Sequence, residues 1–443
     1  MNDIWKSLLR RSFRKGWVVV LSIFLVPSLA RGAITVTNLT SPYALQDSNL
    51  ATAGPHVLLF VEQVTNTSTT IPVTNLTTTL SFTGGASLSF VPGESATRTL
   101  GSLATSTSIT FYWFVEYPNS ATSASSTFTY QFQTTTSEGD NVTTSGSLSR
   151  VSAIASSNQT IPKASFSGVA ILGNTISEIV DIDFGNVNSS TNQLRAELVG
   201  PAGAPFNAAI LRLVSATISF NLGNTLPTYT NVLYFDNDKP SPTPQFPAAV
   251  TANSGNVHAT STFIWKIVGV GSTTLRPYEG SAGSSAGFKY NGDYDTRLTD
   301  TSPTSTNTLT VSTSASPSAV APSGTTTVTI MVSNASQLAS ADLDQIIDTL
   351  PSGATYVSGS ASYNGVPIPD PVTVGSQLIW NGPFTVPADG SSMLTFQVRM
   401  PPTEGIYVIS AIAKVGDTQV DVTTDTTDAA PATAGVIVSN SCP

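Results

Sequence analysis

Short hydrophobic runs separated by turn-forming residues recur along this chain from about residue 34 onward. Residues 56–64 and 109–117 are almost continuously apolar, whereas residues 128–132 alternate apolar and polar side chains. Gly-Gly, Pro-Gly and Gly-Asp pairs lie between such runs, where turns connect strands. After the N-terminal region no helical pattern of convincing length follows. The pattern predicts an all-β fold in which the continuous runs are central strands of β-sandwiches.

Polar connectors divide the chain, and its length suits three domains of roughly 100–150 residues. We predict an N-terminal signal peptide, a first immunoglobulin-like sandwich, a second sandwich of uncertain type, a third immunoglobulin-like sandwich and a tail: 1–32, 33–150, 164–302, 309–427 and 428–443. The connectors are residues 151–163 and 299–308. In the second segment we expect strands at 209–221, 232–235 and 263–270, and a Pro-rich loop, 239–247, that covers a sheet edge because proline cannot donate to a ladder.

The third segment has a distinctive order of short motifs. They are the strand 327–334 ending in V-S-N-A-S, then D-T-L-P-S-G-A-T-Y-V-S-G from Asp348, L-I-W from Leu378, P-A-D-G-S from Pro387 and L-T-F-Q-V from Leu394. Turn chemistry accounts for Asn334, Pro351 and Gly353. We expect Trp380 and Phe396 to fill the space between two sheets.

These motifs cover about 100 residues in order, and together the segment closely resembles the DUF11 family of immunoglobulin-like repeats. The resemblance implies a bacterial surface or envelope protein, and it implies no particular activity. Where the family often ends N-T-A-T-V, this chain has Ser410-Ala-Ile-Ala413.

The sequence of the first segment resembles that of the third, which predicts that the two are distant copies of one domain. We match Val64–Ser68 with Val332–Ser336, Ile109-Thr-Phe111 with Leu394-Thr-Phe396, and Gly139-Asp140 with Gly416-Asp417. The longer interval in the third segment predicts an extra hairpin within residues 363–374. Repetition of one sandwich is how stalks and adhesins gain length.

Residues 1–32 have the three parts of a signal peptide. A basic stretch is followed by the apolar run 17–26 and by small residues near Ala30 and Gly32. The alternatives are an uncleaved anchor, for which the run is short, and a twin-arginine signal at Arg10-Arg11. The sequence predicts a secreted or surface protein with no stable membrane span after signal removal.

Charge and cysteine content narrow the partners. Charged residues make up only 10% of the chain, and removal of residues 1–32 takes away six basic residues and one acidic residue, leaving a net charge of −14. Such an acidic chain repels nucleic acid and anionic lipid. Cys442 is the only cysteine, so no intramolecular disulfide forms; an intermolecular one is the alternative to an incidental residue.

The sequence contains only weak candidates for catalytic or metal-binding residues. Gly283–Gly287 fits G-x-S-x-G around Ser285, but no helix pattern or later histidine follows, and only His56 and His258 are present. Carboxylates spaced by two occur at Asp181 and Asp183, at Asp236 and Asp238, and in the loop of Asn291, Asp293 and Asp295. We take Asn291, Asp293 and Asp295 as the candidate calcium ligands, with ordinary turn formation as the alternative. We expect no other cofactor.

Three further hypotheses concern single segments. Lys266 and Lys414 are candidates for a Lys–Asn isopeptide bond, with an edge lysine as the alternative. The aromatic run 111–114 is either a sugar platform or core. Residues 33–38 or 434–439 either complete a neighbouring subunit's sheet or pair within their own domain.

The interpretation that follows is a non-catalytic structural or adhesive surface protein whose partners are other surface proteins or glycans. The alternatives are a carbohydrate- or protein-binding module and, less favoured, a polysaccharide hydrolase.

Overall fold

The computed structural model describes residues 33–441, with gaps at residues 41–42, 48–55, 85–87, 118–126, 155–164, 187–191, 198–206, 222–228, 231–255, 274–278, 285–295, 298–303 and 425–429. Every regular element among these residues is a β-strand, and nearly all pairings are antiparallel. The fold is therefore all-β, as predicted. The described part contains no helix with the length and hydropathy of a membrane span. Gly32–Pro443 form one unit by their contacts.

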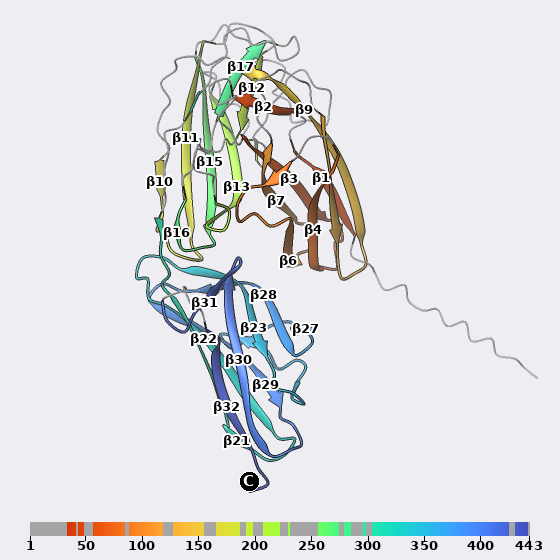
Figure 1. Cartoon of the computed structure of the whole chain (residues 1–443), viewed down its shortest axis with the longest axis vertical. Helices are drawn as coiled ribbons and strands as arrows, with labels where there is room; N and C mark the ends of the chain where they lie inside the picture. The colour runs from red at the N-terminus through yellow and green to blue at the C-terminus, as the bar shows by residue number, and fades with distance from the viewer. Residues whose placement is uncertain are drawn as a thin grey trace, which may run out of the picture. The chain divides into compact units, whose positions relative to one another are not determined.

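Two sheets form the first sandwich (Figure 1). One sheet has the order β1 (Ile34–Asn38), β3 (His56–Asn66), β7 (Ser108–Tyr117) and β5 (Ser89–Phe90). The other has the order β2 (Tyr43–Asp47), β9 (Asn141–Ile154), β8 (Thr127–Thr135), β4 (Val73–Gly84) and β6 (Thr97–Leu103). Inward-facing aromatics, among them Phe60, Trp113 and Phe132, fill the space between them.

The third sandwich is built from residues 309–438. One sheet has the order β20 (Leu309–Ser316), β22 (Thr325–Asn334), β29 (Gly390–Arg399), β25 (Ser362–Tyr363) and β26 (Val366–Pro367), and β24 (Thr355–Tyr356) also pairs with β29. The other has the order β21 (Ala319–Val320), β32 (Ala432–Val438), β30 (Gly405–Val415), β23 (Ala341–Thr349), β28 (Gln377–Val386) and β27 (Val372–Val374), with β31 (Thr418–Val420) beside β30.

The core of the third sandwich confirms the expected role of its aromatic residues. Trp380 and Phe396 lie on opposite sheets, are buried, and their ring centroids are 4.8 Å apart. Gly353 has a φ of 83°, a left-handed conformation that explains why the D-T-L-P-S-G turn requires glycine there. The predicted extra hairpin is present as β25 and β26, joined by Asn364 and Gly365, which both have positive φ.

The first and third sandwiches share one topology, so the prediction of a repeat is confirmed at the level of strand order. In each, an edge strand, β2 or β21, pairs in parallel with the last long strand, β9 or β32. In each, that strand is followed across the sheet by the long strand that precedes it in sequence, β8 or β30, and then by β4 or β23.

The two copies also share a buried asparagine turn. Asn66 Nδ2 donates to the carbonyl of Ile71 (3.0 Å), and Asn334 Nδ2 donates to that of Ala339 (2.9 Å), five residues onward in both. Each side-chain oxygen accepts the backbone N–H two residues later at 3.0 Å. A side-chain amide thus satisfies backbone groups that the sandwich interior would otherwise leave unpaired.

One detail of the predicted alignment is wrong by two residues. Trp113 pairs with Phe60, six residues before Asn66, and Phe396 pairs with Val328, six residues before Asn334. The structural counterpart of Phe396 is therefore Trp113, not Phe111. Similar apolar residues at alternate positions made a shift of two invisible, because it keeps every side chain on the same face.

The middle segment contributes one long sheet of β10 (Ser165–Ser167), β11 (Thr175–Asn186), β15 (Asn256–Ile267), β13 (Leu211–Asn221) and β14 (Tyr229–Thr230). Smaller sheets are β12 (Asn192–Glu197), β17 (Glu279–Ser284) and β18 (Thr296–Arg297), and β16 (Gly271–Ser272) with β19 (Thr304–Ser305). The predicted strand 232–235 and the Pro-rich loop 239–247 lie outside the described residues. The predicted connector 151–163 is wrong at its start, because β9 continues to Ile154.

Strand β7 explains why residues 109–117 are continuously apolar. Phe111 and Trp113 face the core of the first sandwich. Phe114 points the other way and stacks on Trp265 of β15, with centroids 5.7 Å apart. Both faces of β7 are therefore covered, and the aromatic run is packed between sheets and is not a sugar platform.

The buried asparagine turn leads to a stability prediction. We expect Asn334→Ala to lower the free energy of unfolding by about 1–3 kcal/mol, because it leaves buried backbone groups without partners. The measurement is urea unfolding of the full chain. Asn440→Ala, at an exposed position, is the matched control and should change little; equal losses in both variants would contradict the role of the turn.

Candidate functional site: buried carboxyls and a charged junction

The candidates taken from the sequence do not form a described site. Asn291, Asp293 and Asp295 lie outside the described residues, as do Asp236, Asp238, Ser285 and Cys442, so the calcium site stays a prediction. Within the described part, no group of three or more potential metal ligands comes together. Asp181 and Asp183, the pair of carboxylates spaced by two, lie in the middle of β11, where they pair with Thr260 and His258 of β15.

The first sandwich buries a carboxyl that the sequence analysis did not single out. Glu62 is on β3 and is 0% exposed. The Thr78 hydroxyl donates to its Oε2 at 2.5 Å, and the Thr134 hydroxyl lies 3.1 Å from its Oε1. Burial raises the pKa of Glu62 to about 7, although the two threonine hydrogen bonds act to lower it.

The middle and third segments each bury a similar group. Trp265 Nε1 donates to Glu178 Oε2 at 2.7 Å, whereas Glu178 Oε1 has no hydrogen-bond partner among the described residues. Both carboxyl oxygens of Asp348 lack a partner within the same part of the chain. Burial raises the pKa of each carboxyl to about 8.

These three carboxyls are sealed inside apolar layers. Each is 0% exposed, so a substrate cannot reach them without opening a sandwich. Their protonated forms are favoured because a charge in such surroundings is costly. A sequence signal was available: Glu62 and Asp348 stand at strand positions whose alternate neighbours, such as Val64 and Ile346, are core residues.

A second concentration of polar groups lies where the three segments meet. Arg98 forms an ion pair with Glu94, and both side chains are nearly buried. Arg98 also donates to the carbonyls of Ser95 (2.9 Å) and Tyr112 (3.0 Å), and it lies over the Trp113 ring at 5.4 Å. Glu94 accepts the backbone N–H of Phe114 at 3.1 Å. Both members of the pair are thus engaged by the sandwich itself.

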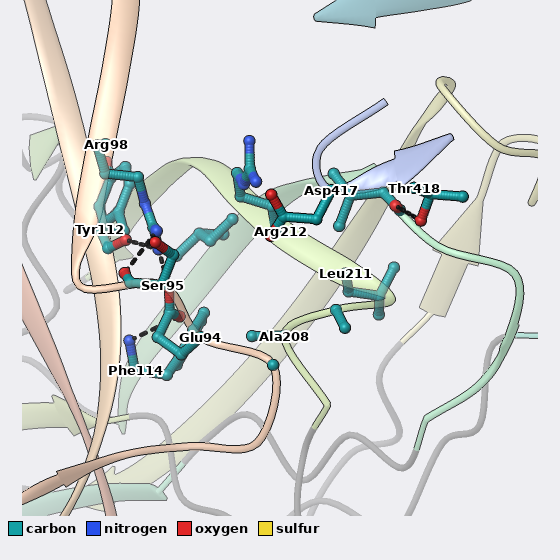
Figure 2. Close-up of a pocket in the computed structure, with 14 residues that line it drawn as sticks. Glu94, Ser95, Arg98, Tyr112, Phe114, Ala208, Leu211, Arg212, Asp417 and Thr418 are labelled. Carbon is teal, nitrogen blue, oxygen red and sulfur yellow. Dashed lines mark hydrogen bonds and ion pairs between the residues drawn. The ribbon is translucent and has the colours of Figure 1, made fainter. Parts of the chain in front are cut away.

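The pocket beside this ion pair is small, with a volume of about 150 Å³. Figure 2 shows Arg98, Glu94 and Tyr112 on one side of it, with Arg212, Asp417 and Thr418 on the other. Arg212 comes from β13 of the middle segment, whereas Asp417 and Thr418 come from the turn and the start of β31. The pocket therefore has lining residues from all three segments.

Lys266 and Asp344 form the second ion pair of the junction. Lys266 Nζ lies 2.7 Å from Asp344 Oδ1, and the backbone N–H of Gly416 donates to Asp344 Oδ2 at 2.6 Å. Lys266 is on β15, an interior strand of its sheet, so the alternative of an edge lysine is wrong for this residue. Its neighbour is an aspartate and not the asparagine of a Lys–Asn isopeptide bond. The pair ties the middle segment to the third.

Neutral hydrogen bonds and apolar contacts reinforce this junction. The Thr418 hydroxyl donates to the carbonyl of Val268 at 2.7 Å, and the N–H of Asp342 donates to the carbonyl of Gly173 at 2.9 Å. Leu172 and Val268 of the middle segment belong to the core of the third sandwich. On the other side, the N–H of Ala208 donates to the carbonyl of Pro92 at 2.9 Å.

The strands proposed for exchange between subunits pair within the chain. β1 pairs with β3, and β32 pairs with β30 and β21. The polar groups described above thus connect the sheets to one another. They do so through ion pairs and hydrogen bonds.

The chain resembles known proteins only at low similarity. No protein-family model matches the chain, and no curated protein matches it, so the resemblance to the DUF11 family rests on the motifs alone. The solved structures that match the chain include bacterial proteins, all at low identity. The C-terminal domain of the Streptococcus agalactiae AgI/II polypeptide BspA is 10% identical, with a TM-score of 0.23, over 63% of this chain and 96% of that one.

Two other solved structures have comparable scores. The type II cohesin dyad from the adaptor ScaA scaffoldin of Acetivibrio cellulolyticus is 7% identical, with a TM-score of 0.20, over 59% of this chain and 95% of that one. The secreted serine protease VesC from Vibrio cholerae is 9% identical, with a TM-score of 0.18, over 52% and 49%.

The buried carboxyls lead to a prediction for pH. In the unfolded chain they lose their protons near pH 4, whereas in the folded chain they keep them to about pH 7 or 8. The folded state binds more protons between these values, so stability falls as the pH rises from about 4 to about 8. We expect a lower Tm at pH 8 than at pH 5 by circular dichroism.

Asp348→Asn should reduce this fall in Tm, because the amide does not ionise. Asp370→Asn is the control: hydrogen bonds from Ser358, Tyr356 and Gly359 lower the pKa of the exposed Asp370 carboxyl, so it is ionised throughout this pH range. A fall in Tm that is unchanged in Asp348→Asn would contradict the assignment.

The two ion pairs of the junction should differ in their contribution. Arg98→Met leaves Glu94 buried without its cation, and we expect a loss of about 3–5 kcal/mol in the free energy of unfolding. Lys266→Met removes the same charge beside Asp344, whose side chain is 31% exposed, and should cost less than about 1 kcal/mol. Urea unfolding of both variants measures the difference; equal costs would show that burial does not decide it.

Proposed function

We propose that this chain is an exported, non-catalytic structural or adhesive protein of a bacterial surface or extracellular space. We infer that its domains are the three predicted segments, residues 33–150, 164–302 and 309–427, with β32 (Ala432–Val438) added to the third. In this proposal residues 1–32 direct export. Other surface proteins or glycans are the partners.

One observation carries the proposal: the buried acids of the described interior are enclosed by strands and sheets of the same chain. Glu62, Glu178 and Asp348 are sealed in cores, and Glu94 has both oxygens engaged by Arg98 and Phe114. An acid that serves catalysis must reach its substrate. These acids are enclosed by the chain itself, which supports a structural role.

The junction adds a second support. Ion pairs, hydrogen bonds and shared apolar residues join the segments. Domains that move freely usually meet through small polar interfaces. A junction of this kind suits a protein that transmits force or presents a surface at a fixed distance.

A binding module is the second candidate, favoured by a groove in the third sandwich. The groove has a volume of about 570 Å³ and lies between the D-T-L-P-S-G turn and residues 373–378. Leu350, Leu378 and Tyr356 line it together with the hydroxyl-bearing residues Ser352, Thr355, Thr373 and Ser376. Its lining is uncharged, which suits a neutral glycan or peptide.

The test of the proposal is localisation combined with attachment. The full chain, expressed in a bacterial host with a C-terminal tag, should be found outside the cytosol with an N-terminus near residue 31 or 33 by mass spectrometry. Deletion of residues 1–32 should retain it in the cytosol. Beads coated with the exported protein should adhere to bacterial cells or to purified envelope.

Other outcomes would favour the alternatives. Retention of the full chain in the cytosol would contradict export. Hydrolysis of a polysaccharide from a broad panel would contradict the non-catalytic role. Glycan-array binding that is abolished by Tyr356→Ala, with the fold intact, would establish the binding module in place of a purely structural part.

A further inference from the structure

The outer face of one sheet in the third sandwich carries large apolar side chains. On β30, Ile409, Ala411 and Ala413 face the core, so the residues between them face outward. Ile406 is 77% exposed, Val408 is 54% exposed, and Ile437 on β32 is 49% exposed. We define the isoleucine face by these residues and their neighbours on the same side of the sheet: Ile347, Ile379, Ile406, Val408, Ile412 and Ile437.

Strand register makes this face continuous. Ile406 is paired with Ile437 across β30 and β32. Ile347 on β23 is paired with Ile412 on one side and with Ile379 on the other. Side chains paired in this way lie next to one another on one face of a sheet. Ile347 is itself only 7% exposed, so the exposed apolar surface lies on β30 and β32, at Ile406, Val408 and Ile437.

The first sandwich provides an internal control. Its topologically equivalent strands β8 and β9 present polar residues outward: Thr129, Gln131 and Gln133 on β8, and Thr143 and Ser145 on β9. The fold accordingly does not need an apolar outer face on this sheet. The isoleucines of the third sandwich are a property of that copy alone, and an exposed apolar patch of this kind marks an interaction site.

The chain also shows how it covers an apolar outer face elsewhere. Tyr112 and Phe114 project outward from the first sandwich and are buried, with Phe114 stacked on Trp265 of the middle sheet. Another sheet is the cover in that case. None of the described hydrogen bonds or ring contacts places a further sheet over Ile406 and Val408.

The charged residues at the two ends of β30 indicate which partner covers the isoleucine face. Glu404 directly precedes the strand, and Lys414 lies near its other end on the outward side. When two copies of β30 face each other in antiparallel directions, Ile406 of one copy lies over Ile412 of the other. The same arrangement brings Glu404 of each copy to Lys414 of the other. The face is thus complementary to itself about a two-fold axis, as an isologous dimer requires.

We propose that the isoleucine face joins two copies of this chain, sheet against sheet, with antiparallel β30 strands and reciprocal Glu404–Lys414 pairs. Facing sheets commonly pack with their strands nearly aligned. This dimer uses a covered face and not exchanged strands, so it goes beyond the proposed function and does not depend on it.

Sedimentation velocity of the full chain over a wide concentration range tests the dimer. We expect a concentration-dependent monomer–dimer equilibrium. The double variant Ile406→Thr, Val408→Thr replaces two apolar residues of the isoleucine face with threonine, a residue type that the first sandwich has at its outward positions. This variant should weaken dimerisation at least about tenfold. Met331→Thr combined with Met393→Thr, two partly exposed residues on the other sheet, is the matched control and should leave it unchanged.

Charge reversal tests the two-fold arrangement. Lys414→Glu and Glu404→Lys should each weaken the dimer, and the variant with both reversals should recover it. Circular dichroism confirms that each variant is folded. The proposal is overturned if the unaltered chain sediments as a monomer at every concentration, if the threonine variant dimerises normally, or if the monomer instead binds neutral phospholipid vesicles through this face.

Discussion

The contact of one apolar sheet face with another is the interaction on which this structure depends. Charged residues are only 10% of the chain and the sequence offers no disulfide pair, so most of the stabilisation must come from burial. Side chains alternate between the two faces of a strand, and each sandwich closes the inner faces. Strand β7 goes further, because Phe111 and Trp113 fill one core while Phe114 packs on Trp265 of the middle segment. That second contact joins the first sandwich to the middle segment.

The first and third sandwiches have one topology but differ in what their surfaces contact. Both keep the asparagine turn, because Asn66 and Asn334 each satisfy backbone groups in the interior. They differ on their outer faces: the first copy covers the sheet containing β7 and leaves β8 polar, whereas the third has isoleucine on the strand that corresponds to β8. The interior is constrained by the fold, and the exterior is free to acquire contacts.

Much of the fold could be predicted from the sequence. Strands around residues 56–64, 109–117 and 327–334, the repeat, the extra hairpin and the packing of Trp380 on Phe396 follow from alternation and turn chemistry. The register between copies could not, because a shift of two residues preserves alternation. The candidate site was largely missed, since Lys266 and Asp344 are 78 residues apart and only the packing of two segments brings them together. Glu62 and Asp348 could have been predicted, because they are acids at strand positions that alternate with core residues such as Val64 and Ile346.

The residues that the middle segment places in the third core have a consequence for how the chain is divided. Leu172 and Val268 lie more than 40 residues before β20, and they are buried among the side chains of the third sandwich. The unit that folds cooperatively therefore does not end where the repeat ends. A fragment that begins at residue 309 would contain the whole strand order of the sandwich and would still have an apolar opening at one end. Evolution can copy such a module freely only if each copy also receives a neighbour that closes it.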